Sequence, residues 1–202
     1  MPIFDNDRIN LLTDAEVKDL YARPEFTAAE RKHFFSLAKP DYALLQKHKK
    51  LKPKVYFILQ LGYFRAAKQF YKFSFEDAVE DITYIIQTYF DDPEKLLTGR
   101  IWKETYRQQK NDILALYKYN DWSSKYTNQV EAHLEELIKF YPKGNDTLRE
   151  LFVYFENNKL VIPSYRTLQD LFSRVFKTET KRLNKIVKSI PVRIPINFTT
   201  LC

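Results

Sequence analysis

Two blocks rich in lysine and arginine contain the candidate binding residues of this chain. Residues 39–72 carry nine Lys and Arg against one acidic residue, and residues 159–193 carry nine against two. The net charge of the whole chain is only +7, so the remainder of the chain is acidic. Clustered cations on an otherwise acidic chain indicate surfaces that bind a polyanion such as nucleic acid. Solvated surface lysines are the alternative interpretation, and charge alone does not separate the two.

The densest part of the first block is the stretch KHKKLKPK at 47–54, which is followed at once by the apolar stretch VYFILQLGYF. Pro40 and Pro53 suit the first turns of two helices, at about 40–48 and 53–70. Two helices joined by a tight turn can form a DNA-binding helix-turn-helix. The second helix is apolar nearly all round, which is typical of a core helix. We therefore predict phosphate contacts from this pair, made by Lys47, Lys49, Lys50, Lys52, Lys54, Arg65 and Lys68.

The second block contains an amphipathic pattern between residues 167 and 177. Apolar residues recur there at helical spacing, namely Leu168, Leu171, Phe172, Val175 and Phe176. Glutamine pairs with adenine and arginine with guanine in the major groove, so the polar face could read bases. The predicted base contacts are Arg166, Gln169, Ser173, Arg174 and Lys177. A following basic helix at 179–189 would supply phosphate contacts from Lys181, Arg182, Lys185 and Lys188. A surface helix with a polar outer face is the alternative.

Residues that commonly carry catalysis or bind metals lack a functional arrangement in this sequence. His33, His48 and His133 are far apart and show no metal-ligand spacing. Cys202 is the only cysteine, which excludes an intramolecular disulfide and a cysteine-based zinc site. Scattered Asp and Glu could form a two-metal site, but the sequence singles out no trio. We therefore expect no cofactor, no bound metal, no catalytic residue and no small-molecule substrate.

Helix-capping patterns predict an all-α fold. Thr13 with Glu16 and Thr27 with Glu30 have the spacing of capping boxes, and Ser74 begins another capping sequence. We predict two helical DNA-binding subdomains with helix-turn-helix-like pairs. They cover residues 1–95 and 96–190, and an irregular tail covers 191–202. The longest apolar run is about ten residues, half of a membrane span, and no signal-peptide core is visible. These features predict a soluble intracellular protein with no membrane partner.

Three segments together carry a family resemblance. They are LLTDAEVKDLYARP at 11–24, FSLAKPDYALLQKHKKLKPKVYFILQLGYFR at 35–65 and LVIPSYRTLQDL at 160–171. In this order they resemble the N-terminal region of the Tn-three family of replicative bacterial transposases. The matching residues are Asp41, Leu44, Phe57, Leu59, Gln60, Leu61, Arg65, Pro163, Thr167, Leu168 and Leu171. The sequence departs from the family pattern at Pro53, Tyr56, Gly62, Ser164 and Arg166.

The resemblance, which covers about residues 8–190, implies recognition of the terminal inverted repeats of a transposon. The catalytic acidic triad of that family lies far downstream in an RNase H-like domain, so we expect this chain to carry only the DNA-end-binding part. Double-stranded DNA is then the expected partner, full-length transposase a second candidate partner, and the cytoplasm, at the nucleoid, the expected location. Two alternatives stay open: a truncated transposase that acts as a regulatory or protein-interaction module, and an inert remnant.

Overall fold

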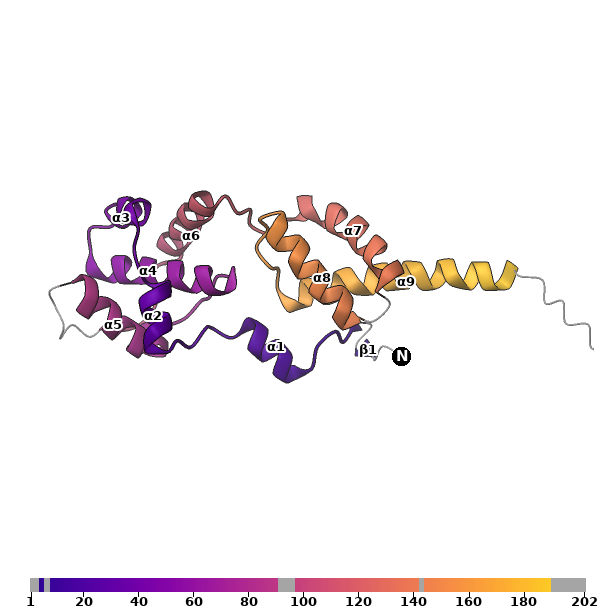
Figure 1. The fold of residues 1–202 in the computed structure, drawn as a ribbon, viewed down its shortest axis with the longest axis horizontal. Coiled ribbons are helices and arrows are strands. Elements are labelled where there is room, and N and C mark those ends of the chain that lie inside the picture. The colour runs from indigo at the N-terminus through magenta and orange to yellow at the C-terminus, as the bar shows by residue number, and fades with distance from the viewer. Residues whose placement is uncertain (1–3, 6–7, 91–96, 142–143, 190–202) are drawn as a thin grey trace, which may run out of the picture. The chain divides into compact units, whose positions relative to one another are not determined.

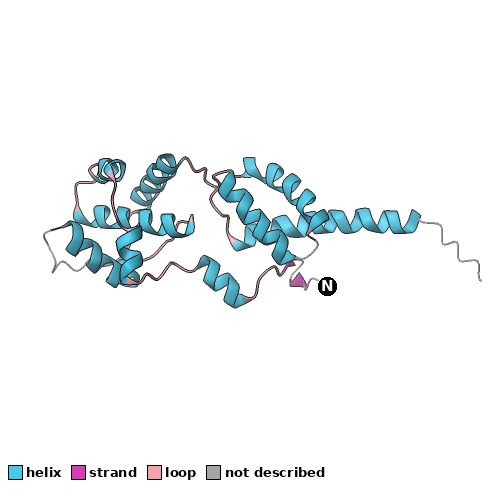
Figure 2. Cartoon of the chain, viewed as in Figure 1, coloured by secondary structure: helices cyan, strands magenta, loops and turns pink. Residues whose placement is uncertain are grey.

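The computed structural model describes residues 4–5, 8–90, 97–141 and 144–189, and this part of the chain is all-α (Figure 1). The all-α prediction is confirmed. The strands β1 (Phe4–Asp5) and β2 (Arg8–Ile9) pair as a short antiparallel ribbon (Figure 2). The predicted tail at 191–202 lies outside the described residues.

The described residues divide into two compact units. The larger unit contains residues 14–123 and 152–163, and the smaller unit contains the described residues of 1–13, 124–151 and 164–202. The predicted boundary between residues 95 and 96 lies outside the described residues. The larger unit holds the helices on both sides of that point, because they pack on one shared central helix.

The larger unit is built around one buried helix. Its elements are α1 (Asp14–Tyr21), α2 (Ala28–Phe34), α3 (Lys39–Leu45), α4 (Leu51–Ala67), the 3-10 turn η1 (Phe75–Ala78), α5 (Val79–Tyr89) and α6 (Lys103–Tyr117). Figure 1 shows α4 running through the middle of this unit, and it packs against α2, α3, α5 and α6. All side chains from Val55 to Phe64 are buried. The interpretation of this apolar stretch as a core helix is therefore confirmed.

Local capping bonds explain where several of these elements begin. The Thr27 hydroxyl accepts a hydrogen bond from the Glu30 amide at 3.3 Å, and the Glu30 carboxylate accepts one from the Thr27 amide at 2.8 Å. This is the predicted capping box of α2. The Ser74 amide likewise donates to Asp77 at 2.7 Å, at the start of η1. Both pairs satisfy backbone groups that the first turn leaves unpaired.

The smaller unit is organised around the last helix. Its elements are β1, β2, η2 (Ser124–Tyr126), α7 (Thr127–Phe140), the first half of α8 (Gly144–Asn157), which continues into the larger unit, and α9 (Tyr165–Ser189). α7 and β2 pack against α9. We predicted two helices, at 167–177 and 179–189, but the structure has one continuous helix. The reason is that no glycine or proline interrupts the helical pattern between residues 165 and 189.

Candidate nucleic-acid interface

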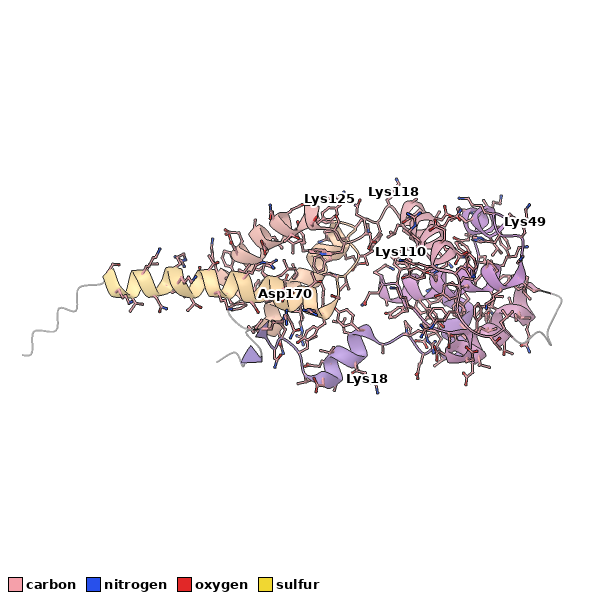
Figure 3. All side chains as sticks on the ribbon, turned by 180° about the vertical axis from the view of Figure 1, so that it is seen from behind. Lys18, Lys49, Lys110, Lys118, Lys125 and Asp170 are labelled. Carbon is pink, nitrogen blue, oxygen red and sulfur yellow. The ribbon has the colours of Figure 1, made fainter. Side chains whose placement is uncertain are left out.

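The basic turn, residues 46–50 between α3 and α4, presents two exposed lysines. Lys49 and Lys50 are both exposed, and Lys49 is labelled in Figure 3. Within the described part of the chain, the ammonium groups of Lys49, Lys50 and Lys54 have no ion-pair or hydrogen-bond partner. Three unpaired cations therefore lie within six residues at the start of α4.

Buried hydrogen bonds to α6 hold this turn in place. The Gln109 side-chain nitrogen donates to the Pro53 carbonyl at 2.8 Å and lies 3.2 Å from His48 Nε2. Gln60 donates to the Gln109 side-chain oxygen at 3.3 Å. Since an amide nitrogen can only donate, His48 accepts here and is the neutral tautomer with its proton on Nδ1. Burial lowers the pKa of His48, which favours this neutral form.

Two further lysines of the stretch serve partly as anchors. Lys47 pairs with Asp112 of α6 at 2.8 Å. Lys52 donates to the Thr98 carbonyl at 2.6 Å, and its ammonium lies 5.1 Å above the centre of the Phe75 ring. These contacts fasten the turn to two other segments of the larger unit. The predicted phosphate contacts are therefore most available at Lys49, Lys50 and Lys54.

The prediction that Arg65 and Lys68 bind phosphates needs correction. The Arg65 guanidinium donates to Asp41 and to the Tyr117 hydroxyl, both at 2.6 Å, and to the carbonyls of Phe34 and Ser36. Lys68 is half-buried, and its ammonium donates to the Arg65 carbonyl at 2.6 Å. Both cations are occupied by internal contacts at the end of α4 that lies away from the basic turn.

Two of the predicted base-reading residues are covered by the N-terminal segment. Ser173 is only 6% exposed, and its hydroxyl accepts a hydrogen bond from the Ile9 amide at 3.0 Å. Gln169 donates to the Ile9 carbonyl at 3.3 Å, and Arg8 pairs at 2.6 Å with Asp170, which is labelled in Figure 3. Ser173 is therefore not available to read bases, because β2 occupies this face of α9, whereas Gln169 is half-buried and bonded to Ile9. The contacts join residues about 160 positions apart, so local sequence gave no signal for them.

The other predicted residues of α9 remain at the surface. Arg174 is exposed and pairs with Glu131 of α7, whereas Arg166 is exposed with no ion-pair partner among the described residues. Arg182 pairs with Glu179 of its own helix at 2.6 Å. The exposed lysines of the helix are Lys177, Lys181, Lys185 and Lys188.

The C-terminal half of α9 has two distinct faces. Its four exposed lysines are spaced by four, four and three residues, so they share one side of the helix, which we call the basic face. Ile186 and Val187 lie three and four residues after Leu183, so these apolar residues share the other side of the helix. They are 45%, 66% and 47% exposed, respectively. Every described residue from Thr180 onward is exposed. The basic face is thus open to a polyanion along about three helical turns.

The sequence prediction missed a third group of exposed cations, which lies just before and at the start of α6. Arg100 and Lys103 are exposed and flank Trp102, which is 83% exposed. They follow Thr98, whose carbonyl binds Lys52. A tryptophan between two cations was the available signal, but it lies next to the segment that we predicted as a domain boundary.

Among the described residues, no group of three or more His, Cys, Asp or Glu side chains could hold a metal ion. No helix in the described ranges combines the length and apolar character needed to cross a membrane.

No curated protein matches the chain. A family model described as a domain of unknown function (DUF4158) matches residues 11–175, which include the basic turn and the buried half of α9. Since the match covers most of the sequence, the chain belongs to the DUF4158 family.

Proposed function

We propose that this chain is a double-stranded DNA-binding module whose target is the terminal inverted repeat of a replicative bacterial transposon. The observation that carries the DNA-binding part is the basic turn, where Lys49 and Lys50 are exposed, unpaired within the described residues and held on an anchored backbone. The transposon part rests on the three motifs that resemble the N-terminal region of Tn-three family transposases. A bacterial DNA target would place the chain in the cytoplasm, at the nucleoid.

The anchoring of the turn favours binding, because a flexible lysine loop would lose conformational entropy on contact with DNA. The buried contacts of His48, Gln109 and Pro53 fix the backbone before any ligand arrives. Nearby carboxylates are already paired, Asp112 with Lys47 and Glu104 with Arg107. The positive charge of Lys49 and Lys50 is therefore not neutralised from within the described part of the unit.

The structure changes the expected division of roles between the two basic blocks. With Gln169 and Ser173 bonded to the N-terminal segment, Arg166 and Lys177 are the exposed candidates for base contacts near the start of α9. The basic turn and the basic face of α9 would supply phosphate contacts, which carry affinity rather than sequence preference. We therefore expect binding with a large salt-dependent part and a modest sequence preference.

The test is fluorescence anisotropy with a labelled duplex that contains the cognate inverted repeat, measured at several salt concentrations. The double variant Lys49→Ala/Lys50→Ala should weaken binding to every duplex. It should also reduce the slope of log K against log salt by about 1.8, since each phosphate contact contributes about 0.9. The matched control is Lys32→Ala/Lys72→Ala, which removes the same charge from two exposed lysines elsewhere in the larger unit.

The control separates a local site from a general charge effect. Equal losses in the two double variants would contradict the assignment to the basic turn. Absence of duplex binding by the native chain would refute DNA binding altogether. Equal affinity for the inverted repeat and a scrambled duplex at moderate salt would refute the transposon-end target and leave a non-specific DNA-binding module.

A further inference from the structure

Trp102 is the most exposed large apolar side chain in the described part of the protein. It is 83% exposed at the N-cap position of α6, and it makes no capping hydrogen bond with its side chain. The second tryptophan, Trp122, is half-buried and packs edge-on against Phe155, with ring centres 6.0 Å apart. The fold therefore uses Trp122 for packing and leaves the indole of Trp102 in water.

The backbone that presents Trp102 is fixed rather than loose. The Phe75 amide donates to the Gly99 carbonyl at 2.9 Å, and the Gly99 amide donates to the Glu76 carboxylate at 2.7 Å. Gly99 has a φ of +72°, which glycine adopts without strain. Thr98 is bonded to Lys52, one of the lysines at the start of α4. Four residues after Thr98, Trp102 is the N-cap residue of α6, so the exposed ring follows a segment that Lys52 ties to the start of α4.

One cationic residue precedes Trp102 in the sequence and another follows it. Arg100 and Lys103 are exposed, and neither has an ion-pair partner among the described residues. Of the neighbouring carboxylates, Glu76 accepts from Gly99, and Glu104 pairs with Arg107 at 2.7 Å. Asp77 accepts from the Ser74 amide and interacts electrostatically with Arg100. We call Arg100, Trp102 and Lys103 the tryptophan patch. An exposed aromatic ring between unpaired cations matches the requirements of a nucleic-acid strand, which offers phosphates and flat bases.

We propose that the tryptophan patch binds an unpaired nucleotide next to the duplex that the basic turn holds, with the base stacked on Trp102 and the adjacent phosphates on Arg100 and Lys103. Inside a closed duplex, neighbouring base pairs cover both faces of each base, so an internal paired base cannot stack on the indole. Stacking requires no particular base, because every base has a π-face. This inference rests on the proposed function, in that it places the patch beside a duplex-binding surface.

The test uses the full chain with Trp122→Phe, so that Trp102 is the single tryptophan and its fluorescence reports the patch alone. A blunt duplex and the same duplex with a short single-stranded overhang are compared. We expect the overhang to quench the fluorescence and to bind roughly 5- to 100-fold more tightly than the blunt duplex, as one stacked base would give. Trp102→Ala should abolish this difference and leave the affinity for the blunt duplex unchanged.

Controls distinguish failure of this inference from failure of the proposed function. Equal affinity for the two DNAs, or an overhang preference that survives in Trp102→Ala, would overturn the stacking role while blunt-duplex binding still supported the proposed function. Quenching by vesicles of anionic phospholipid without quenching by DNA would overturn it in favour of a lipid surface. Binding of the overhang strand alone, with no binding of the blunt duplex, would support the stacking role and refute duplex binding. Because the Trp102 ring is exposed, Trp102→Ala should leave the melting temperature unchanged, which would verify that the fold is intact.

Discussion

The packing of α4 against α2 makes a sharp prediction at Gly62, in the middle of the buried helix. A Cβ atom at this position would lie 2.3 Å from Cδ1 and 2.4 Å from Cε1 of Phe35. The Phe35 ring is 0% exposed, and it packs against Phe26 and Tyr63 with ring centres 5.3 and 5.9 Å away. The ring has no open space to enter, so a methyl group at position 62 would force α2 away from α4.

Two opposing effects set the size of the change for Gly62→Ala. Alanine is favoured over glycine in a helix interior by about 1 kcal/mol. Overpacking of a tight core costs about 1–3 kcal/mol, and the enclosed ring at 2.3 Å places this site in the upper part of that range. We expect a net loss of about 1–2 kcal/mol. For a chain of this size, that loss lowers the melting temperature by roughly 2–8 °C.

Thermal unfolding followed by circular dichroism measures this loss. Gly144→Ala is the control, because a Cβ there would lie 3.5 Å from a Leu11 methyl carbon, an ordinary contact distance. The double variant Gly62→Ala/Phe35→Leu should lose less stability than the sum of its two single changes, since the smaller side chain relieves the clash. An unchanged or raised melting temperature for Gly62→Ala would refute the described packing of α2 on α4. DNA affinity of the folded variant should be unchanged, because the basic turn lies at the start of α4, about three helical turns before Gly62.

Two further predictions concern the anchor of the basic turn and the covered face of α9. His48 has a lowered pKa in the folded state, so below its ordinary value of about 6.5 the unfolded chain binds a proton that the folded chain does not. The free energy of unfolding should therefore fall as pH decreases through this region and level off below the lowered pKa. Urea unfolding between about pH 5 and 8 should show that His48→Gln reduces this pH dependence, and an unchanged slope would contradict the buried neutral imidazole. Ser173→Ala leaves the buried Ile9 amide without its acceptor and should cost about 1–3 kcal/mol of stability by urea unfolding. If Ser173→Ala instead lost its DNA sequence preference while its stability stayed unchanged, Ser173 would have to contact DNA.

Local chemistry in the sequence was enough to predict several elements of the fold. The capping box of Thr27 and Glu30 needs only a three-residue spacing, and it begins α2 as expected. The apolar stretch that starts at Val55 is buried throughout, because a helix without a polar side can only be stable inside a core. The predicted break after residue 177 failed, because nothing in the local sequence interrupts helical bonding there.

The roles of the individual cations could not be predicted in the same way. Arg65 and Lys49 both belong to one basic block, yet the first is bonded to Asp41 and Tyr117 and the second is exposed. What separates them is burial and the position of partners from other helices, which residue type and spacing do not report. For this reason the number of lysines and arginines in a block overstated the number that can contact DNA.

Residue types and their spacing were sufficient to predict the helical class, the core helix α4 and the lysine-rich turn at its start. These properties depend on side-chain type and on the 3.6-residue period, which act over a few positions. Long-range packing, by contrast, places β2 on Ser173 and Gln169, lets Gln109 anchor the turn through His48, and leaves Trp102 exposed. The first two depend on contacts between residues tens to more than a hundred positions apart, and the last on the lack of any such contact over the indole. Both are set by how the helices pack, and local sequence does not encode that packing.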